Sequence, residues 1–345
     1  MSLTEVQFEG ASLQEAPARA IAGRSPWQLA WRRLRSDRVA IASGIVILLL
    51  CAVALAAPLI SGAVGKSYAQ QFRGTGVTTY GLPVGPSNTF WFGTDNLGRD
   101  IFIRVVYGAR VSLFVGLSST LIAVVAGVAV GLFAGFYGGV IDGVLARFMD
   151  TVLAFPYLLL GIALAAIFGP NLLMVIGVIS FFSWAALSRI VRGQTLSIKE
   201  KEYIEAARAI GSSPFRIMFV DILPNVLAPV IVIATLLVPS AIVFEATLSF
   251  LGVGVVPPTP SWGNMISDSL QFYQVAWWFL VFPSAALLLT TLAFNLLGDG
   301  VRDALDPRTE RIFAARRKRR TLDVEQLQAT VAAQEAGPGA AGMVG

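Results

Sequence analysis

Val111–Phe136 reads VSLFVGLSSTLIAVVAGVAVGLFAGF, a stretch without a charged side chain. An α-helix rises about 1.5 Å per residue, so this stretch is long enough to cross the roughly 30 Å hydrocarbon core of a bilayer. Five further stretches are similarly apolar: Val39–Ile60, Thr151–Phe168, Leu172–Leu187, Val226–Phe250 and Val275–Leu297. We therefore predict an all-α integral membrane protein with six transmembrane helices.

The composition agrees with a membrane protein and excludes several kinds of chemistry. Of the 345 residues, 55% are hydrophobic and only 14% are charged, whereas about a quarter are charged in a typical soluble domain. The chain has no histidine, and its single cysteine, Cys51, lies in the first apolar stretch. These absences exclude histidine-ligated metals, histidine-dependent nucleophiles, intrachain disulfides and thiolate clusters. We expect Cys51 to be a packing residue, and no cofactor or metal in this chain.

The 26 basic residues are divided unequally by the predicted topology. Six spans place both chain ends on one side, and that side holds 21 Lys and Arg residues against 5 on the other. Because basic loops are retained in the cytoplasm, both termini are predicted to be cytoplasmic. The basic surplus is thus an orientation signal that also favours contact with membrane lipids. Nucleic-acid binding is not expected, even for the run Arg316–Arg320.

The topology divides the chain into regions. We expect a cytoplasmic N-terminal arm (1–38), a first transmembrane helix (39–60), an extracytoplasmic segment (61–106), a core with five transmembrane helices (107–300) and a partly disordered, basic cytoplasmic tail (301–345). The core includes a cytoplasmic loop over residues 194–225, which is the most informative part of the chain.

This loop predicts two short helices set at an angle. Lys199–Ala209 is charged and alanine-rich, and Gly211 can take the positive φ that ends a helix. A second helix then begins with a serine cap, Ser212 or Ser213, and Pro224 is expected to close it.

The second helix has Pro214 in its first turn, where the missing N–H costs nothing. It would display apolar side chains to a groove of a partner subunit; these are Phe215, Ile217, Met218 and Phe219. A loop folded back on its own bundle stays open as the alternative.

Glu205-Ala206-Ala207 is followed by Gly211 and, at the end of the loop, by Leu223-Pro224. This pattern resembles the EAA loop of bacterial ABC importer permeases, with Asp221 as a minor departure where an apolar residue is usual. The resemblance implies a coupling element that sits in a cleft of an ATP-binding subunit. The coupling residues that it implies are Glu205, Ala206, Ala207, Gly211, Phe215, Leu223 and Pro224.

Three further stretches resemble the second ("C"-type) permease of dipeptide and oligopeptide importers. They are FGTDNLGRD (92–100) with YGARVSL (107–113), ATLSFLG (246–252) with Pro257-Pro258 and SWG (261–263), and NLLGDGVRDALDP (295–307). The resemblance runs from Trp27 to Arg308. It implies a type I ABC importer-like permease fold in the bacterial inner membrane. The implied partners are a homologous second permease, two ATP-binding subunits and an extracytoplasmic solute-binding protein.

The chain has no G-x-x-x-x-G-K-[ST] phosphate loop, so ATP and Mg are expected in the partner subunits. By itself the chain is not expected to be an enzyme. The resemblance implies di- or oligopeptides as cargo, and nickel complexes, glutathione or other small solutes stay as alternatives. A self-sufficient secondary transporter would need matched broken helices and an ion relay, which the sequence does not suggest.

Glu245 is the one acid within a predicted span, and an intramembrane carboxylate is a candidate functional group. It would line the translocation path, or it would pair with a basic group of the outer loop or of the partner permease. Near the second cytoplasmic turn, Arg147 is expected to pair locally with Asp150.

Two groups of residues are expected on the outer side. The polar string that contains Asp95, Arg99 and Asp100 is expected to cap the bundle rather than to bind substrate. The tryptophans are expected in an interfacial aromatic belt; these are Trp262, Trp277 and Trp278.

Overall fold

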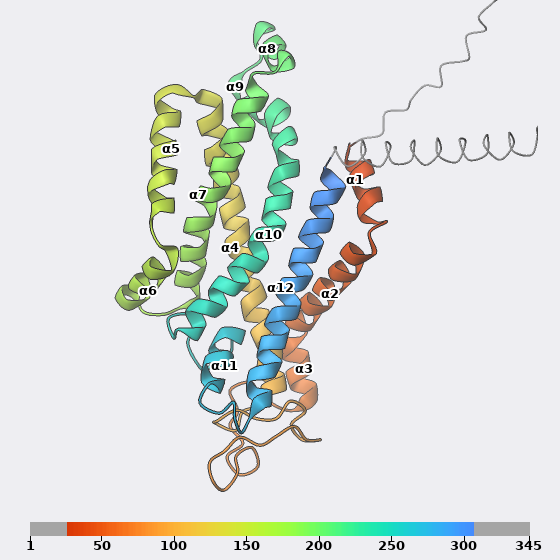
Figure 1. Ribbon diagram of the computed structural model, residues 1–345, viewed down its shortest axis with the longest axis vertical. Helices are drawn as coiled ribbons and strands as arrows, with labels where there is room; N and C mark the ends of the chain where they lie inside the picture. The colour runs from red at the N-terminus through yellow and green to blue at the C-terminus, as the bar shows by residue number, and fades with distance from the viewer. Residues whose placement is uncertain (1–25, 307–345) are drawn as a thin grey trace, which may run out of the picture.

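The computed structural model describes residues 26–306, which form an elongated bundle of helices (Figure 1). The elements are α1 (Pro26–Leu34), α2 (Arg38–Leu55), α3 (Ala57–Val64), α4 (Ile101–Tyr137), α5 (Gly139–Ala154), α6 (Tyr157–Phe168), α7 (Leu172–Lys199), α8 (Glu202–Ala209), α9 (Pro214–Arg216), the π-helix η1 (Ile217–Ile222), α10 (Leu223–Phe250), α11 (Trp262–Ser269) and α12 (Trp277–Leu305). α1 and the end of α12 lie toward the same end of the bundle as α8 (Figure 1). The predictions for residues 1–25 and 307–345 lie outside the described residues.

Five described helices are long and apolar enough to cross a membrane: α2, α4, α7, the continuous helix Pro214–Phe250, and α12. The pair α5 and α6, bent by 80°, makes a sixth crossing if it is counted as one span. The all-α membrane fold is thereby confirmed, but the third predicted span, Thr151–Phe168, is wrong as a single helix. The helix ends at Ala154 because Pro156 lacks an N–H and favours extended backbone at Phe155 (φ −77°, ψ 135°).

Several helices extend beyond their predicted ends. α4 begins at Ile101, where the side chain of Asp100 accepts the N–H of Ile103 at 3.2 Å. α7 continues to Lys199, well past the predicted end at Leu187. The segments 61–106 and 194–225 therefore contain more helix than the sequence suggested, because charged residues at the membrane surface do not end a helix.

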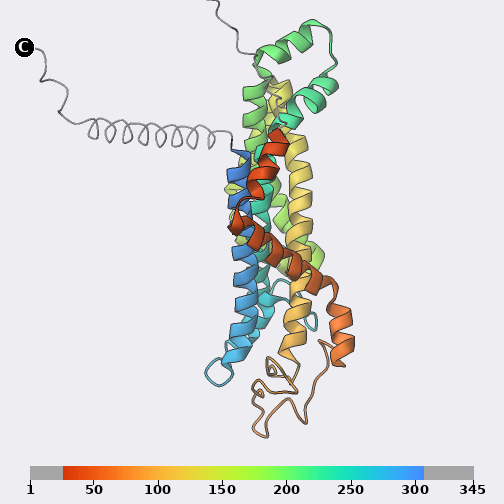
Figure 2. The same ribbon diagram turned by 90° about the vertical axis from the view of Figure 1, so that its right-hand side faces the viewer.

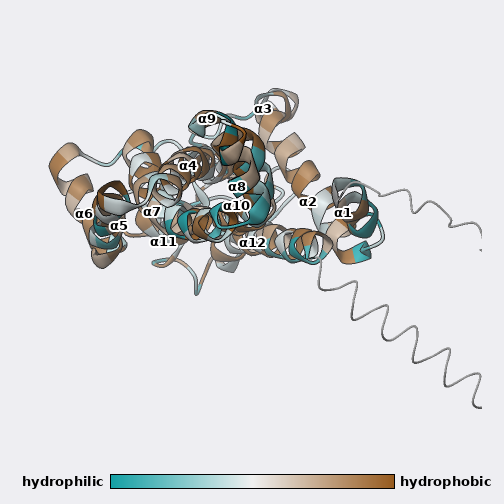
Figure 3. Ribbon diagram, turned by 90° about the horizontal axis from the view of Figure 1, so that it is seen from above, coloured by the Kyte–Doolittle hydropathy of each residue, from teal (hydrophilic) through white to brown (hydrophobic). Residues whose placement is uncertain are grey.

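α4 and α7 pack closely at the centre of the described bundle. Three glycines one turn apart on α4, which are Gly127, Gly131 and Gly135, face α7. The Ser188 hydroxyl of α7 donates to the Gly127 carbonyl at 3.1 Å. Small residues of this spacing let two helix backbones approach, which is typical of membrane helix pairs. In Figure 3, the outlying α6 and α2 are largely hydrophobic, whereas hydrophilic residues appear on α1 and α8.

The outer segment between α3 and α4 folds beneath the bundle (Figure 2) and is joined to it by buried ion pairs. Arg99 Nε donates to Asp95 Oδ2 at 2.6 Å, and Arg104 Nε lies 3.4 Å from the same oxygen. Lys66 pairs with Asp100 at 2.7 Å. Arg99 also lies 3.7 Å from Asp268 of α11, and burial raises the pKa of the Asp268 carboxyl. The outer string is therefore a polar cap, as its sequence suggested.

Two local predictions are corrected. Asp150 pairs with Arg189 of α7 rather than with Arg147 of its own helix, and so ties α5 to α7. Trp262 and Trp278 are buried, and their indole N–H groups donate to carbonyls of Val105 and Thr94, so that the aromatic belt is reduced to the exposed Trp277. Tertiary packing places the Trp262 indole against the first turns of α4 and the Trp278 indole against the outer segment, which the sequence position alone did not indicate.

Candidate functional site

The cytoplasmic loop turns at Gly211, immediately after α8. Gly211 has φ +81°, its N–H donates to the Arg208 carbonyl, and the next N–H, of Ser212, donates to the Ala207 carbonyl. These two bonds form the glycine-dependent helix end that was predicted. A Cβ atom on Gly211 would meet nothing within 4 Å. The glycine is therefore required for its backbone conformation and not for space.

Beyond the turn, the second helix does not stop at Pro224. Ser213 is the cap, and its side chain accepts the N–H of Arg216 at 3.3 Å. The chain then runs through η1 into α10 as one helix, Pro214–Phe250, of 37 residues. Within η1 the bonding is wider, and the Leu223 N–H donates to the Met218 carbonyl. This widened turn accommodates the proline ring, so the prediction of a separate second helix closed by Pro224 is wrong.

The apolar side chains of this loop divide into two groups. Ile217 and Met218 are buried together with Ile204 of α8 and attach the loop to the bundle. Phe215 and Phe219 are 61% and 47% exposed, and their rings stack in parallel with centroids 6.3 Å apart. Both alternatives for the loop are thus partly correct: one face folds back on the bundle, and the other displays two aromatic rings.

The remaining predicted coupling residues lie on the same cytoplasmic end. Glu205 and Ala206 are exposed on α8, Ala207 is half-buried, and Pro224 is exposed beside the half-buried Leu223. The Glu205 side chain does not cap α8. In the described part of the chain it forms no hydrogen bond or ion pair, so it is free to contact a partner subunit.

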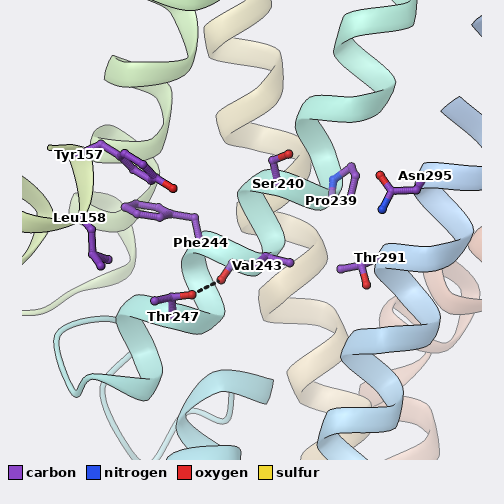
Figure 4. A pocket seen from close by; sticks show the side chains of 9 residues that line it. All are labelled: Tyr157, Leu158, Pro239, Ser240, Val243, Phe244, Thr247, Thr291 and Asn295. Atoms are coloured by element: carbon purple, nitrogen blue, oxygen red, sulfur yellow. Dashed lines mark hydrogen bonds between the residues drawn. The ribbon is translucent and has the colours of Figure 1, made fainter. Parts of the chain in front are cut away.

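Farther along the same helix, a cavity of about 360 Å³ opens between α6, α10 and α12 (Figure 4). Its lining carries no charged side chain; it consists of Tyr157, Leu158, Pro239, Ser240, Val243, Phe244, Thr247, Thr291 and Asn295. The hydroxyls of Ser240, Thr247 and Thr291 donate to carbonyls of their own helices, at 3.0, 2.8 and 2.9 Å. Sequence reasoning missed this cavity, although Pro239 and Asn295 were signals within apolar stretches.

Glu245 lies between the cavity-lining residues Phe244 and Thr247 on α10 but does not itself line the cavity. Its carboxylate is fully buried between α10 and α4, where it accepts hydrogen bonds from Ser112 at 2.8 Å and Ser249 at 2.7 Å. Its described partners are therefore hydroxyls and not a basic group. A path role for Glu245 stays a prediction, and it would require the contact between α4 and α10 to open.

Within residues 26–306, no group of three or more Asp, Glu or Cys side chains is arranged to hold a metal ion. The described features are an exposed pair of aromatic rings on the cytoplasmic loop and an uncharged cavity, joined by one helix.

Comparison with known proteins identifies the family. "Binding-protein-dependent transport system inner membrane component" matches residues 127–311, a little over half of the chain. "N-terminal TM domain of oligopeptide transport permease C" matches residues 25–75. A chain of the inward-facing MetNI methionine ABC transporter is similar in fold, with a TM-score of 0.50 over 59% of this chain and 96% of that chain, at 18% identity.

Curated relatives are similar over most of their length. The dipeptide transport system permease protein DppC of Alkalihalophilus pseudofirmus is 45% identical over 82% of this chain and 90% of its own. The oligopeptide transport system permease protein OppC of Escherichia coli is 43% identical (84% and 93%). The glutathione transport system permease protein GsiD of Pectobacterium atrosepticum is 41% identical (83% and 92%). With this extent of similarity, the chain belongs to the family of inner-membrane permease components of binding-protein-dependent ABC transport systems.

Proposed function

We propose that this chain is one of two permease subunits of an ATP-driven importer and forms half of the translocation path for di- or oligopeptides. A solute-binding protein would deliver the cargo, and two ATP-binding subunits would bind ATP and Mg. The relatives named for dipeptides, oligopeptides and glutathione support a peptide-like cargo, because glutathione is itself a tripeptide.

The observation that carries this proposal is the continuity of Pro214–Phe250. One end of this helix displays the stacked rings of Phe215 and Phe219, and its middle forms a wall of the uncharged cavity. Phe219 and Val243 are 24 positions apart, which corresponds to about 36 Å at about 1.5 Å per residue.

A single helix of this length transmits a displacement at one end to the other. Closure of ATP-binding subunits around the loop would shift the cytoplasmic end of α10 and rock its cavity wall. Ile217 and Met218, which are buried, would transfer part of that displacement to α7 and α4. The coupling roles predicted for Glu205, Ala206, Ala207, Gly211, Phe215, Leu223 and Pro224 are retained as part of the proposal.

The test is ATP-dependent uptake by the complete importer reconstituted in vesicles. The wild-type complex with its binding protein should transport labelled di- or oligopeptides across the vesicle membrane only when ATP is present on the side that carries the ATP-binding subunits. Uptake of glutathione or a nickel complex in place of peptides would identify the alternative cargo. Uptake by the isolated chain without ATPase subunits would indicate a secondary transporter and refute the proposal.

A further inference from the structure

We propose that the cavity between α6, α10 and α12 binds the main chain of a peptide in transit, through uncharged hydrogen-bonding groups that ignore the charge of the cargo side chains. The inference rests on the proposed function, since it takes the cargo to be a peptide. It assigns a ligand class and a mode of recognition to nine lining residues that the sequence did not indicate as a site.

The cavity exists because α10 and α12 separate after a close contact. At Gly298 of α12, a Cβ atom would lie 2.9 Å from Leu236 Cδ2 and 3.1 Å from Thr235 Oγ1, so the helices nearly touch there. One turn farther toward the outer side lie Asn295 and Pro239, which face the opening (Figure 4). Proline inside a helix removes a backbone hydrogen bond and bends the helix, and α10 changes direction in this region (Figure 1).

The lining is chemically complementary to a peptide main chain, which alternates N–H donors and carbonyl acceptors. The hydroxyls of Ser240, Thr247 and Thr291 already donate to their own helices, so each presents an oxygen that accepts. Asn295 adds both a donor and an acceptor, and the Tyr157 hydroxyl can act as either. The volume of about 360 Å³ lies within the range of roughly 300–1,000 Å³ that is typical of ligand sites.

Asn295 indicates that the cavity-lining side of α12 does not contact lipid. It lies 18 residues into α12 and is exposed, and its amide has no hydrogen-bond partner within residues 26–306. Unlike the Asn225 amide, which donates to the Asp221 carbonyl of its own helix, the Asn295 amide makes no bond to α12, and its contact with hydrocarbon would be costly. A water-filled or polar passage satisfies Asn295, whereas a lipid-facing groove would not.

The test uses the complete importer in vesicles and compares uptake of three tripeptides: one uncharged, one with a central lysine and one with a central glutamate. A variant that combines Asn295→Leu with Thr291→Val should reduce uptake of all three by roughly tenfold or more, because hydrogen bonds to the shared main chain are lost. Ser118→Ala is the matched control: Ser118 is half-buried on α4 outside the cavity, and its hydroxyl donates to its own helix. It should leave uptake unchanged.

A second variant separates recognition from a merely structural role. Asn295→Asp is close in shape and places a negative charge on the wall, so it should favour the lysine peptide over the glutamate peptide by several-fold, whereas the wild type treats them alike. A photoreactive residue at position 295 should also label peptide in the cycling complex.

Three results decide the matter. Unchanged uptake in the double variant would overturn the inference, as would equal treatment of both charged peptides by Asn295→Asp. Photolabelling of lipid or of the second permease, without peptide, would also overturn it. If the wild-type importer takes up no peptide with ATP, the proposed function itself fails. This outcome differs from failure of the inference, because uptake is then absent in the wild type and not only in the variants.

Discussion

Gly131→Ala should weaken the contact between α4 and α7 and destabilise the fold. A Cβ atom at this position would lie 2.6 Å from the Ser188 carbonyl oxygen and 2.7 Å from Val191 Cβ, whereas ordinary contacts lie at 3.4–4 Å. A carbonyl of a helix backbone and a Cβ atom cannot rotate out of the way. The two helices must therefore separate by a substantial fraction of an ångström along their contact, and the packing of the neighbouring turns is lost with it.

The matched control is Gly143→Ala in α5, where an added Cβ meets nothing within 4 Å. Both substitutions gain the same helix propensity of about 1 kcal/mol, so their difference isolates the steric cost. Overpacking of this kind typically costs about 1–3 kcal/mol, and we expect Gly131→Ala to be less stable than Gly143→Ala by this amount. The free energy of unfolding, from denaturant titration of both variants in one detergent, measures the difference. Equal stabilities would refute the close approach of α4 and α7.

Three further outcomes are expected. Gly211→Val should reduce peptide uptake per ATP hydrolysed, because a β-branched residue disfavours φ +81° and would change the loop that we propose contacts the ATPase. A coupling ratio in vesicles equal to that of the wild type would contradict this expectation. Ser249→Ala should cost roughly 1–3 kcal/mol in unfolding free energy, since Glu245 loses a buried donor; a thermal melting temperature equal to wild type would count against that contact. Asp95→Asn should cost about 3–5 kcal/mol by leaving Arg104 without its buried counter-charge, and full stability in the same melting experiment would show that the polar cap does not depend on this pair.

The comparison of predicted and observed helices shows which signals are local. A charge-free stretch such as Val111–Phe136 predicts a span correctly, because the cost of placing charge in hydrocarbon acts on each residue separately. The helix end at Gly211 was likewise predicted correctly, since a positive φ is a property of one residue. The break at Phe155-Pro156 had an equally local cause, yet the hydropathy of the surrounding residues concealed it.

The errors share a different origin, which is the choice of partner. Asp150 has a suitable neighbour in Arg147 on its own helix, but α7 brings Arg189 to it instead. Pro224 would end an isolated helix, but η1 widens the preceding turn and lets the helix continue to Phe250. In the first case a contact with another helix outweighs the local ion pair, and in the second a change of backbone hydrogen-bond partner within the helix accommodates the proline.

Hydropathy, charge asymmetry and loop chemistry determined a membrane-spanning chain with its basic loops on one side and a turn at Gly211, because each of these depends on residues that are close in sequence. Tertiary structure alone decided that Glu245 is bonded to serines, that the cytoplasmic loop and the cavity share one helix, and that Asn295 faces an opening beside Pro239. These features depend on the distance between helices far apart in the chain, and that distance is set by packing at contacts such as Gly131 against Ser188.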